Sequence, residues 1–408
     1  MSNVVDYLKD YKDNSFTIVK FNELDGLILS RLSYVAFDKL VTKKKIIKKK
    51  LKDVINDILG EDKNDFRFRL KEDKEILTLL KDSKRYSNLF ISQYVKETNK
   101  EEIKQFSATT FLNKDKRNHF IFISYRGTDG TVTGWKEDFD MCYLPEIPSQ
   151  LSAIKYAQKS LRFIGKENVY LGGHSKGWNL AIYAASNLKR KIKNKIKGIF
   201  VYDSPGFNDT FINSTEFKEI KNKITLFAPS SSVIGRLLNR DYKTVVVQSK
   251  KYMLNQHNVY NWVTKGTSFI VEPKFTYISD KIESLIKDNL DKLSLDEREE
   301  FVNELFKVVK VLSIDDVIIG GEGFVDFLKR FKDVLKDSSE RTKKIILSVF
   351  NKNLLKDLEQ IKKVSPNRIK KPLKIKENIE NAYKKVVNKV KPKKEEPLTL
   401  DLTTGEVK

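Results

Sequence analysis

Short apolar runs alternate with amphipathic stretches through the middle of the chain. The runs have the length and composition of buried strands, and they lie at residues 106–111, 120–125, 169–171, 199–202, 224–227 and 245–247. Stretches with helical periodicity, such as residues 152–163, separate them. Because strands that alternate with helices form mainly parallel sheets flanked by helices, the pattern predicts an α/β fold with its core in residues 106–266.

Helical periodicity dominates on both sides of this core. Residues 1–105 predict a mostly helical N-terminal segment that covers the sheet or the site, with an apolar stripe formed by Leu27, Ile28, Leu29, Leu32 and Phe37. Beyond the core, Ser294 and Glu297 form the pattern of a capping box. Helices are predicted there at residues 277–290, 295–311 and 324–361. We therefore divide the chain into an N-terminal segment 1–105, a core 106–266, a helical region 267–360 and a basic, disordered tail 361–408.

A glycine-rich turn, Gly-His-Ser-Lys-Gly, lies at residues 173–177 between a predicted strand and a predicted helix. This arrangement is typical of a nucleophile elbow, in which a strained serine presents its hydroxyl at the edge of the sheet. Gly173 and Gly177 fit such a tight turn because a Cβ at either position would meet the neighbouring strand or helix. The pattern predicts Ser175 as a nucleophile, and the alternative is a glycine-rich turn with a structural role only.

A serine nucleophile needs a base, and the chain contains three histidines, His119, His174 and His257. His119 opens a strand well before the nucleophile, and His174 lies inside the elbow, where its ring is expected to point away from the serine hydroxyl. His257 follows the strand-like residues 243–248 by a loop, as the base does in the order serine, acid, histidine. We predict His257 as the base, against the alternative of a loop histidine that forms local hydrogen bonds.

Five carboxylates between the nucleophile and the base are candidates for the acid: Asp203, Asp209, Glu216, Glu219 and Asp241. Asp203 closes the apolar run 199–202, so it is expected at the carboxyl edge of the sheet, where catalytic groups of open α/β sheets gather. Asp241 begins a strand at the opposite edge, and the two glutamates fit a helix or loop surface. Asp203 is therefore the predicted acid that orients His257. The alternative role for Asp203 is to cap the turn that follows it.

An oxyanion hole requires one backbone N–H beside the nucleophile and a second from the loop after an early core strand. Lys176 supplies the first by its position. Residues 126–130, Arg-Gly-Thr-Asp-Gly, follow the predicted strand 120–125, and their glycines let the main chain approach a substrate carbonyl. Thr128 is the predicted second donor, and the alternative is an ordinary turn.

Together these motifs resemble the bacterial Mbeg-like α/β hydrolases, a branch related to class 3 triacylglycerol lipases. The resemblance is carried by residues 125–130, 134–139, 173–177, 203–207 and 256–258, and it extends to residues 6–8, 16, 21–25 and 32–34. It implies an α/β-hydrolase core and an ester bond as the target. It also implies Ser175 as nucleophile, His257 as base and Thr128 in the oxyanion loop.

Two positions depart from the family pattern. Trp178 replaces a second glycine after the elbow, and an indole there requires repacking or a displaced helix, which would misplace Ser175. Residues 230–232, all serine, stand where class 3 lipases have the acid, which leaves Asp203 as the substitute. The expected function is a serine carboxylic-ester hydrolase of lipid or phospholipid esters. The alternative is a catalytically degenerate scaffold that binds an anionic membrane or a protein partner.

The chain of 408 residues has a formal net charge of +23, with lysine-rich stretches at residues 43–52 and 361–394. The first stretch continues into an apolar pattern that predicts a basic amphipathic helix. One interpretation is attraction to anionic lipid head groups, and the other is that these are ordinary solvated helix faces. Nucleic acid would experience the same field, but we do not expect it as a partner. The helical C-terminal half is a candidate for recruiting a protein.

The remaining composition limits the chemistry and the location. A single cysteine, Cys142, excludes an internal disulfide framework, and three scattered histidines suggest no metal site and no cofactor. The N-terminus lacks the basic start and apolar core of a signal peptide, and no run approaches the ~20 apolar residues of a membrane span. We expect a cytoplasmic or peripheral membrane protein, with export by a leaderless route left open.

Overall fold

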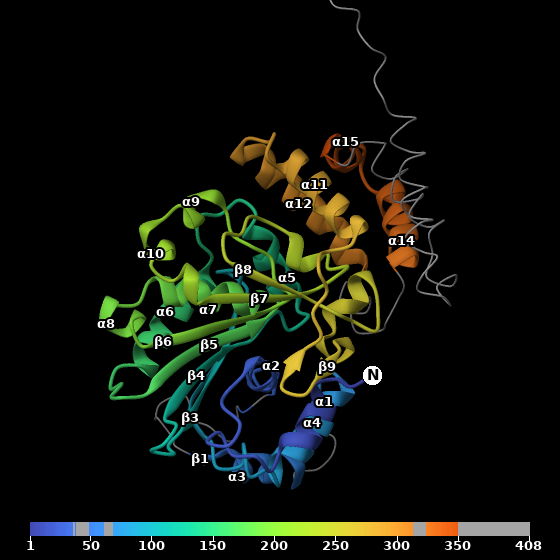
Figure 1. Cartoon of the computed structure of the whole chain (residues 1–408). Helices are drawn as coiled ribbons and strands as arrows, with labels where there is room; N and C mark the ends of the chain where they lie inside the picture. The colour runs from blue at the N-terminus through green and yellow to red at the C-terminus, as the bar shows by residue number, and fades with distance from the viewer. Residues whose placement is uncertain (36, 38–48, 61–67, 313–323, 350–408) are drawn as a thin grey trace, which may run out of the picture. The chain divides into compact units, whose positions relative to one another are not determined.

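An eight-stranded sheet follows the order of the chain from β1 to β8 (Figure 1). The computed structural model describes residues 1–349 except residue 36 and the segments 38–48, 61–67 and 313–323. These residues belong to one compact unit, Met1–Leu354, and the predicted tail 361–408 lies outside the described residues. The strands are β1 (Lys49–Lys50), β2 (Phe90–Asn99), β3 (Lys104–Asn113), β4 (Phe120–Tyr125), β5 (Asn168–His174), β6 (Ile196–Tyr202), β7 (Ile224–Pro229) and β8 (Lys243–Val247).

The sheet is mainly parallel. The pairs from β4 to β8 are parallel, whereas β1 to β4 pair antiparallel. Each of the six predicted core strands is present, and the predicted α/β class is confirmed. The sequence pattern missed β2, because Ser92 and Gln93 interrupt its apolar run. The N-terminal segment therefore also contributes to the sheet. A separate hairpin consists of β9 (Thr264–Lys265) and β10 (Ser268–Phe269).

Both faces of the sheet are covered, which a parallel sheet requires. Side chains alternate along β4: Phe120 and Phe122 pack with the N-terminal helices, and Ile121 and Ile123 pack with the helices of the opposite face. On the first face α2 contacts β4, β5 and β6, and on the other α6 contacts β3 and α7 contacts β5 (Figure 1). The N-terminal helices are α1 (Val4–Tyr11), α2 (Glu23–Leu32), α3 (Leu51–Gly60) and α4 (Lys71–Lys81).

The helices between the core strands largely follow the prediction. Residues 152–163 were expected to be helical, and α6 begins four residues earlier because Pro148 is suited to the first turn of a helix. The helices of this part are α5 (Val132–Asp140), α6 (Pro148–Ser160), α7 (Lys176–Ser186), α8 (Arg190–Lys193), α9 (Asp209–Ile212) and α10 (Thr215–Lys218).

The predicted basic amphipathic helix is wrong at Lys49–Lys50. Lys49–Lys50 form β1 against β2, the helix α3 starts only at Leu51, and residues 43–48 lie outside the described residues. The apolar face of α3 is buried, because Leu51, Val54, Ile55 and Ile58 are at most 3% exposed and belong to the core cluster. Protein therefore covers the face that would have inserted into a membrane.

Helices also follow the core. Ser294 and Glu297 form the predicted capping box: the Ser294 N–H donates to Glu297 Oε2 (2.9 Å) and the Glu297 N–H donates to Ser294 Oγ (3.3 Å). A single helix was predicted over residues 324–361, but the structure has two helices there, separated by a break at Ser338. Residues 350–361 of the predicted helix lie outside the described residues. The described helices are α11 (Tyr277–Leu290), α12 (Leu295–Leu312), α14 (Phe324–Asp337) and α15 (Glu340–Val349). Phe301 and Val302 of α12 pack against Phe139 of α5.

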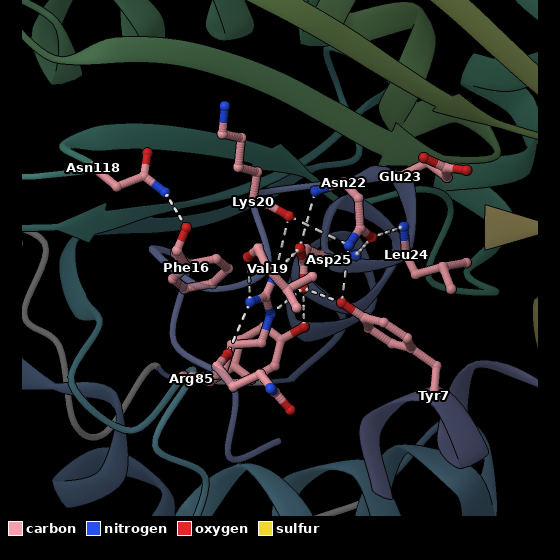
Figure 2. Close-up of polar contacts among 12 residues, drawn as sticks. Tyr7, Phe16, Val19, Lys20, Asn22, Glu23, Leu24, Asp25, Arg85 and Asn118 are labelled. Carbon is pink, nitrogen blue, oxygen red and sulfur yellow. Dashed lines mark hydrogen bonds and ion pairs between the residues drawn. The ribbon is translucent and has the colours of Figure 1, made fainter. Parts of the chain in front are cut away.

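A buried carboxylate holds the N-terminal helices together (Figure 2). Asp25 accepts hydrogen bonds from Tyr7 Oη (2.9 Å), Arg85 Nε (2.8 Å), Arg85 Nη2 (2.5 Å) and the Tyr86 hydroxyl. The Asn22 N–H also donates to it (3.0 Å), which completes the N-cap of α2. Arg85 in turn donates to three carbonyl oxygens in the loop between α1 and α2. The network thus joins α1, α2 and the loop after α4.

Replacement of Asp25 by asparagine is expected to lower the free energy of unfolding by roughly 3–5 kcal/mol, because it leaves Arg85 buried without its charge partner. Both side chains of this pair are 0% exposed. Urea denaturation measures the change. Lys9→Gln, which removes a half-exposed ion pair with Glu75, serves as the control and should hardly move the midpoint. An Asp25→Asn protein as stable as the wild type would contradict the proposed role of the network.

Candidate active site

The turn between β5 and α7 has the geometry of a nucleophile elbow. Ser175 has φ +59° and ψ −137°, a conformation that non-glycine residues rarely adopt. Its N–H donates to the Tyr202 carbonyl (3.1 Å), and its own carbonyl accepts from Ser204 Oγ (2.6 Å). These bonds to the end of β6 and the loop after it hold the strained residue in place.

The elbow glycines allow the close approach that this turn requires. A Cβ on Gly173 would lie 2.5 Å from the carbonyl carbon of Gly177, and a Cβ on Gly177 would collide with the carbonyl oxygen of Tyr125. Main-chain atoms form both obstacles, so no side-chain rotation would relieve the clash. The helix can lie this close to β4 and β5 only with glycine at both positions.

The structure brings Asp203 and His257 together at the carboxyl edge of the sheet. His257 Nδ1 lies 2.8 Å from Asp203 Oδ2, and both side chains are buried. Asp203 follows β6 directly, and His257 ends a short helical turn, Met253–His257. This contact places the proton of the imidazole on Nδ1 and leaves Nε2 as the proton acceptor.

Two groups hold the other oxygen of Asp203. Its Oδ1 accepts from Ser232 Oγ and from the Gly235 N–H (3.1 Å). Ser232 belongs to the run of three serines at residues 230–232, so one member of this run supports the carboxylate of Asp203. Hydrogen bonds to a carboxylate favour its charged form and fix its orientation.

His174 supports His257 from the elbow. Its Nε2 donates to the His257 carbonyl (2.9 Å), its ring centroid lies 4.4 Å from that of His257, and its Nδ1 contacts the Tyr34 hydroxyl (3.2 Å). Burial, together with the neighbouring His257 and Arg31, holds the pKa of His174 well below its usual range. A neutral ring with its proton on Nε2 matches these contacts. From the sequence, His174 was considered only as the base and was rejected. Nothing in its position along the chain indicated this supporting role.

Ser175 and His257 line the same small cavity. Among the described residues, Ser175 Oγ forms no hydrogen bond, so its hydroxyl is unengaged in the cavity that His257 also lines. The other lining residues are Arg31, Tyr34, Arg69, Leu70, Thr128, Trp135, His174 and Asn258. Arg31, Tyr34 and Arg69 come from the N-terminal segment, which therefore contributes to the site, and no sequence motif marked them as site residues.

The loop predicted for the oxyanion hole lies against the elbow. A Cβ on Gly127 would lie 2.6 Å from the His174 carbonyl oxygen and 3.1 Å from Ser175 Cβ, so glycine permits this approach. Arg69 Nη1 donates to the Thr128 carbonyl (2.5 Å). Within the described residues, neither the Thr128 N–H nor the Lys176 N–H donates to another group. Thr128 lines the cavity at Ser175, and Lys176 directly follows Ser175.

A buried ion cluster fixes this loop to the elbow. The Lys176 ammonium is 2.7 Å from Glu137 Oε2 and 3.4 Å from Asp138 Oδ1, and Asp138 accepts from the Thr128 hydroxyl. Burial disfavours the charged lysine, but Asp138 and Glu137 outweigh it and raise the pKa of Lys176. Burial raises the pKa of Asp138 to about 6 against the opposing effect of Lys176. The Lys176 side chain therefore serves as an anchor between the elbow and α5.

The remaining histidine and the tryptophan lie outside the cavity. His119 Nε2 contacts the Lys114 carbonyl (2.6 Å) beside the start of β4, at the sheet edge opposite to Ser175. Trp178 is fully buried on α7, with its ring 5.3 Å from Phe207 and 5.5 Å from Tyr242. The core thus accommodates the indole while the elbow forms.

The described residues contain no cluster of histidine, cysteine, aspartate or glutamate that could hold a metal ion. None of their helices combines the length and the apolar character needed to cross a membrane.

The family model described as Mbeg1-like matches residues 80–307. No curated protein matches the sequence. Solved structures with similarity to the chain include a lipase from Rhizopus microsporus var. chinensis, with 12% identity, TM-score 0.35 and coverage of 64% of this chain and 82% of the other. M37 lipase has 13% identity, TM-score 0.35 and coverage of 83% and 99%. Lipase II from Rhizopus niveus has 14% identity, TM-score 0.34 and coverage of 64% and 89%.

Proposed function

The chain belongs to the Mbeg1-like family, and from that premise we propose that it is a serine carboxylic-ester hydrolase, acting on lipid or phospholipid esters. One observation carries the proposal. His257, which is joined to the buried Asp203 at 2.8 Å, lines the same cavity as a strained Ser175 whose hydroxyl is unengaged. A nucleophile, a base and a group that orients the base are the parts of a serine triad.

In the proposed reaction, Ser175 Oγ attacks the ester carbonyl while His257 Nε2 takes the hydroxyl proton. Asp203 keeps the imidazole in the required tautomer and stabilises the imidazolium that forms. The imidazolium then gives its proton to the leaving alkoxide, and an acyl-enzyme remains. Water, deprotonated by His257, attacks the acyl carbonyl and releases the acid and Ser175. The hydrogen bond between serine and base is often absent without substrate and tightens in the complex.

The backbone N–H groups of Thr128 and Lys176 would stabilise the oxyanion of both tetrahedral intermediates. These N–H groups have no partner among the described residues. The ion pair of Lys176 with Glu137 holds the elbow in place, and the hydrogen bond from the Thr128 hydroxyl to Asp138 holds the neighbouring loop. Donors that are already fixed need no reorganisation when charge develops, which is the source of their catalytic effect.

The degenerate scaffold receives no support from Trp178. That alternative is favoured if the indole fills the acyl site, but Trp178 is not among the residues that line the cavity at Ser175. Attraction to an anionic membrane would rest on the net charge of +23, since the apolar face of α3 is buried.

A fluorophosphonate probe tests the proposal directly, because it labels only serines with enhanced nucleophilicity. We expect the wild type to be labelled and both Ser175→Ala and His257→Ala to lose the label. Ser284→Ala, on the exposed side of α11, is the matched control and should label normally. Absence of labelling in folded wild-type protein would reject the proposed chemistry.

A further inference from the structure

Arg31 lies in the cavity at Ser175 although it belongs to the N-terminal segment. It comes from the last turn of α2, its side chain is 3% exposed, and it lines the same cavity as Ser175 and His257. A buried arginine costs free energy unless its charge and its five N–H donors are matched. The hydrogen-bond partners of Arg31 therefore show how many of its N–H donors are used within the fold.

Asp73 matches only one side of the guanidinium. Arg31 Nε lies 3.0 Å from Asp73 Oδ1, and Nη2 lies 2.8 Å from Oδ1 and 2.7 Å from Oδ2. Nη1 donates no hydrogen bond to Asp73, and the guanidinium carbon lies 5.5 Å from the Tyr260 ring centroid. Asp73 thus leaves Nη1 unused, in a side chain that lines the cavity.

The other groups around Asp73 and Tyr34 make the cavity favourable for an anion. Asp73 is itself occupied, since it also accepts from the Tyr260 hydroxyl (2.6 Å) and the Leu70 N–H (3.0 Å). The guanidinium carbons of Arg31 and Arg69 lie 4.3 Å and 5.6 Å from the Tyr34 ring centroid. Both arginines contribute to the lowered pKa of His174. Two arginines therefore adjoin the Tyr34 ring, and the carboxylate that pairs with Arg31 has both oxygens engaged.

We propose that Arg31 binds an anionic group, a carboxylate or a phosphate, on the ester that Ser175 attacks. The inference rests on the proposed function and narrows its substrate class to esters with a negative charge close to the scissile bond. Arginine suits this role because charge-assisted N–H donors bind carboxylate and phosphate oxygens strongly and with defined geometry. The pairing with Asp73 fixes the side chain so that Nη1 is oriented before the substrate arrives.

Matched substrates test the proposal on the wild type. The soluble pair is 4-acetoxybenzoate and its neutral counterpart 4-acetoxybenzamide, and the lipid pair is dioleoyl phosphatidic acid and dioleoylglycerol in micelles of one neutral detergent. We expect kcat/KM to favour the anionic member about 10- to 100-fold, the range of one hydrogen bond to a charged group. A preference for the anionic ester in both pairs supports the proposal for soluble and lipid esters alike. A preference in one pair alone supports it for the class of ester, soluble or lipid, to which that pair belongs. Equal rates or a preference for the neutral esters in both pairs would overturn it.

A double variant, Arg31→Gln with Asp73→Asn, assigns the preference to Arg31. It leaves the net charge unchanged and leaves no buried charge without a partner. We expect the preference for the anionic ester to fall to within a few-fold of unity, chiefly through a higher KM for that ester. Arg117→Gln, which removes an exposed arginine paired with Asp115, is the control and should retain the preference. A double variant with the wild-type preference would overturn the role of Arg31.

The two proposals fail in different ways. If fluorophosphonate labels Ser175 but neutral esters react at least as fast as anionic ones, the hydrolase remains and the role of Arg31 is rejected. If neither the probe nor any ester reacts, the proposed function fails and the inference with it. Should the double variant not fold, the wild-type comparison alone decides, because it needs no substitution.

Discussion

Ser175→Ala and His257→Ala should each lower kcat for p-nitrophenyl butyrate by about 10⁶-fold, as expected when the nucleophile or the base of a serine triad is removed. The reason is that the two side chains act in one step: without the base the hydroxyl is a weak nucleophile, and without the hydroxyl the base has no proton to take. The double variant should therefore be no slower than either single variant. Steady-state rates with active-site titration measure this non-additivity.

Thermal unfolding must accompany these rates, since a misfolded variant would also be inactive. Ser175 Oγ forms no hydrogen bond among the described residues, so its removal should leave the melting temperature unchanged or higher. Replacement of a functional residue often stabilises a protein. Single variants whose losses multiply in the double variant would indicate that Ser175 and His257 act independently, and would count against the triad.

Asp203→Asn should lower kcat by about 10⁴-fold, the size of effect found when the acid of a serine triad is replaced by its amide. The amide would present an N–H to His257 Nδ1, or at best a neutral oxygen, and so would not stabilise the imidazolium. Asparagine is the appropriate substitution here because Asp203 has φ +43° and asparagine tolerates this conformation. The backbone at the end of β6 should therefore stay in place.

Ser232→Ala gives the matched control for Asp203. It removes one of the hydrogen bonds to Asp203 Oδ1 but leaves the Gly235 N–H and the contact with His257. We expect a loss of about 10-fold, which corresponds to roughly 1.4 kcal/mol for one hydrogen bond to a carboxylate. An Asp203→Asn enzyme with near wild-type activity would show that another group serves as the acid.

The amino-acid sequence determined the fold class and the positions of the core strands along the chain, because strand length, alternation with helices and turn residues are local properties. It also identified the elbow, since glycine at 173 and 177 reflects a steric demand of the turn itself. The hydrophobic pattern was weaker where an element is interrupted or at an edge. It missed β2 and extended the basic helix back through Lys49–Lys50, which pair with β2.

Position along the chain selected Asp203 from five carboxylates, and the structure places it against His257. The supporting contacts were beyond the sequence, because their partners are far apart in the chain: Ser232 reaches Asp203 across 29 positions and His174 reaches His257 across 83. Local periodicity contains no information about such pairs.

Only the tertiary structure decided which residues line the cavity, how Trp178 is accommodated and what the apolar side of α3 contacts. Arg31 and Tyr34 line the cavity with Ser175, which is more than 140 residues away in sequence, because α2 packs on β4, β5 and β6. Trp178 fits because the rings of Phe207 and Tyr242 pack against its indole in the core. The apolar side of α3 is buried because α4 and the sheet cover it. A sequence pattern predicts that a face is apolar or that a residue is charged, but packing between distant segments determines which group that face or charge meets.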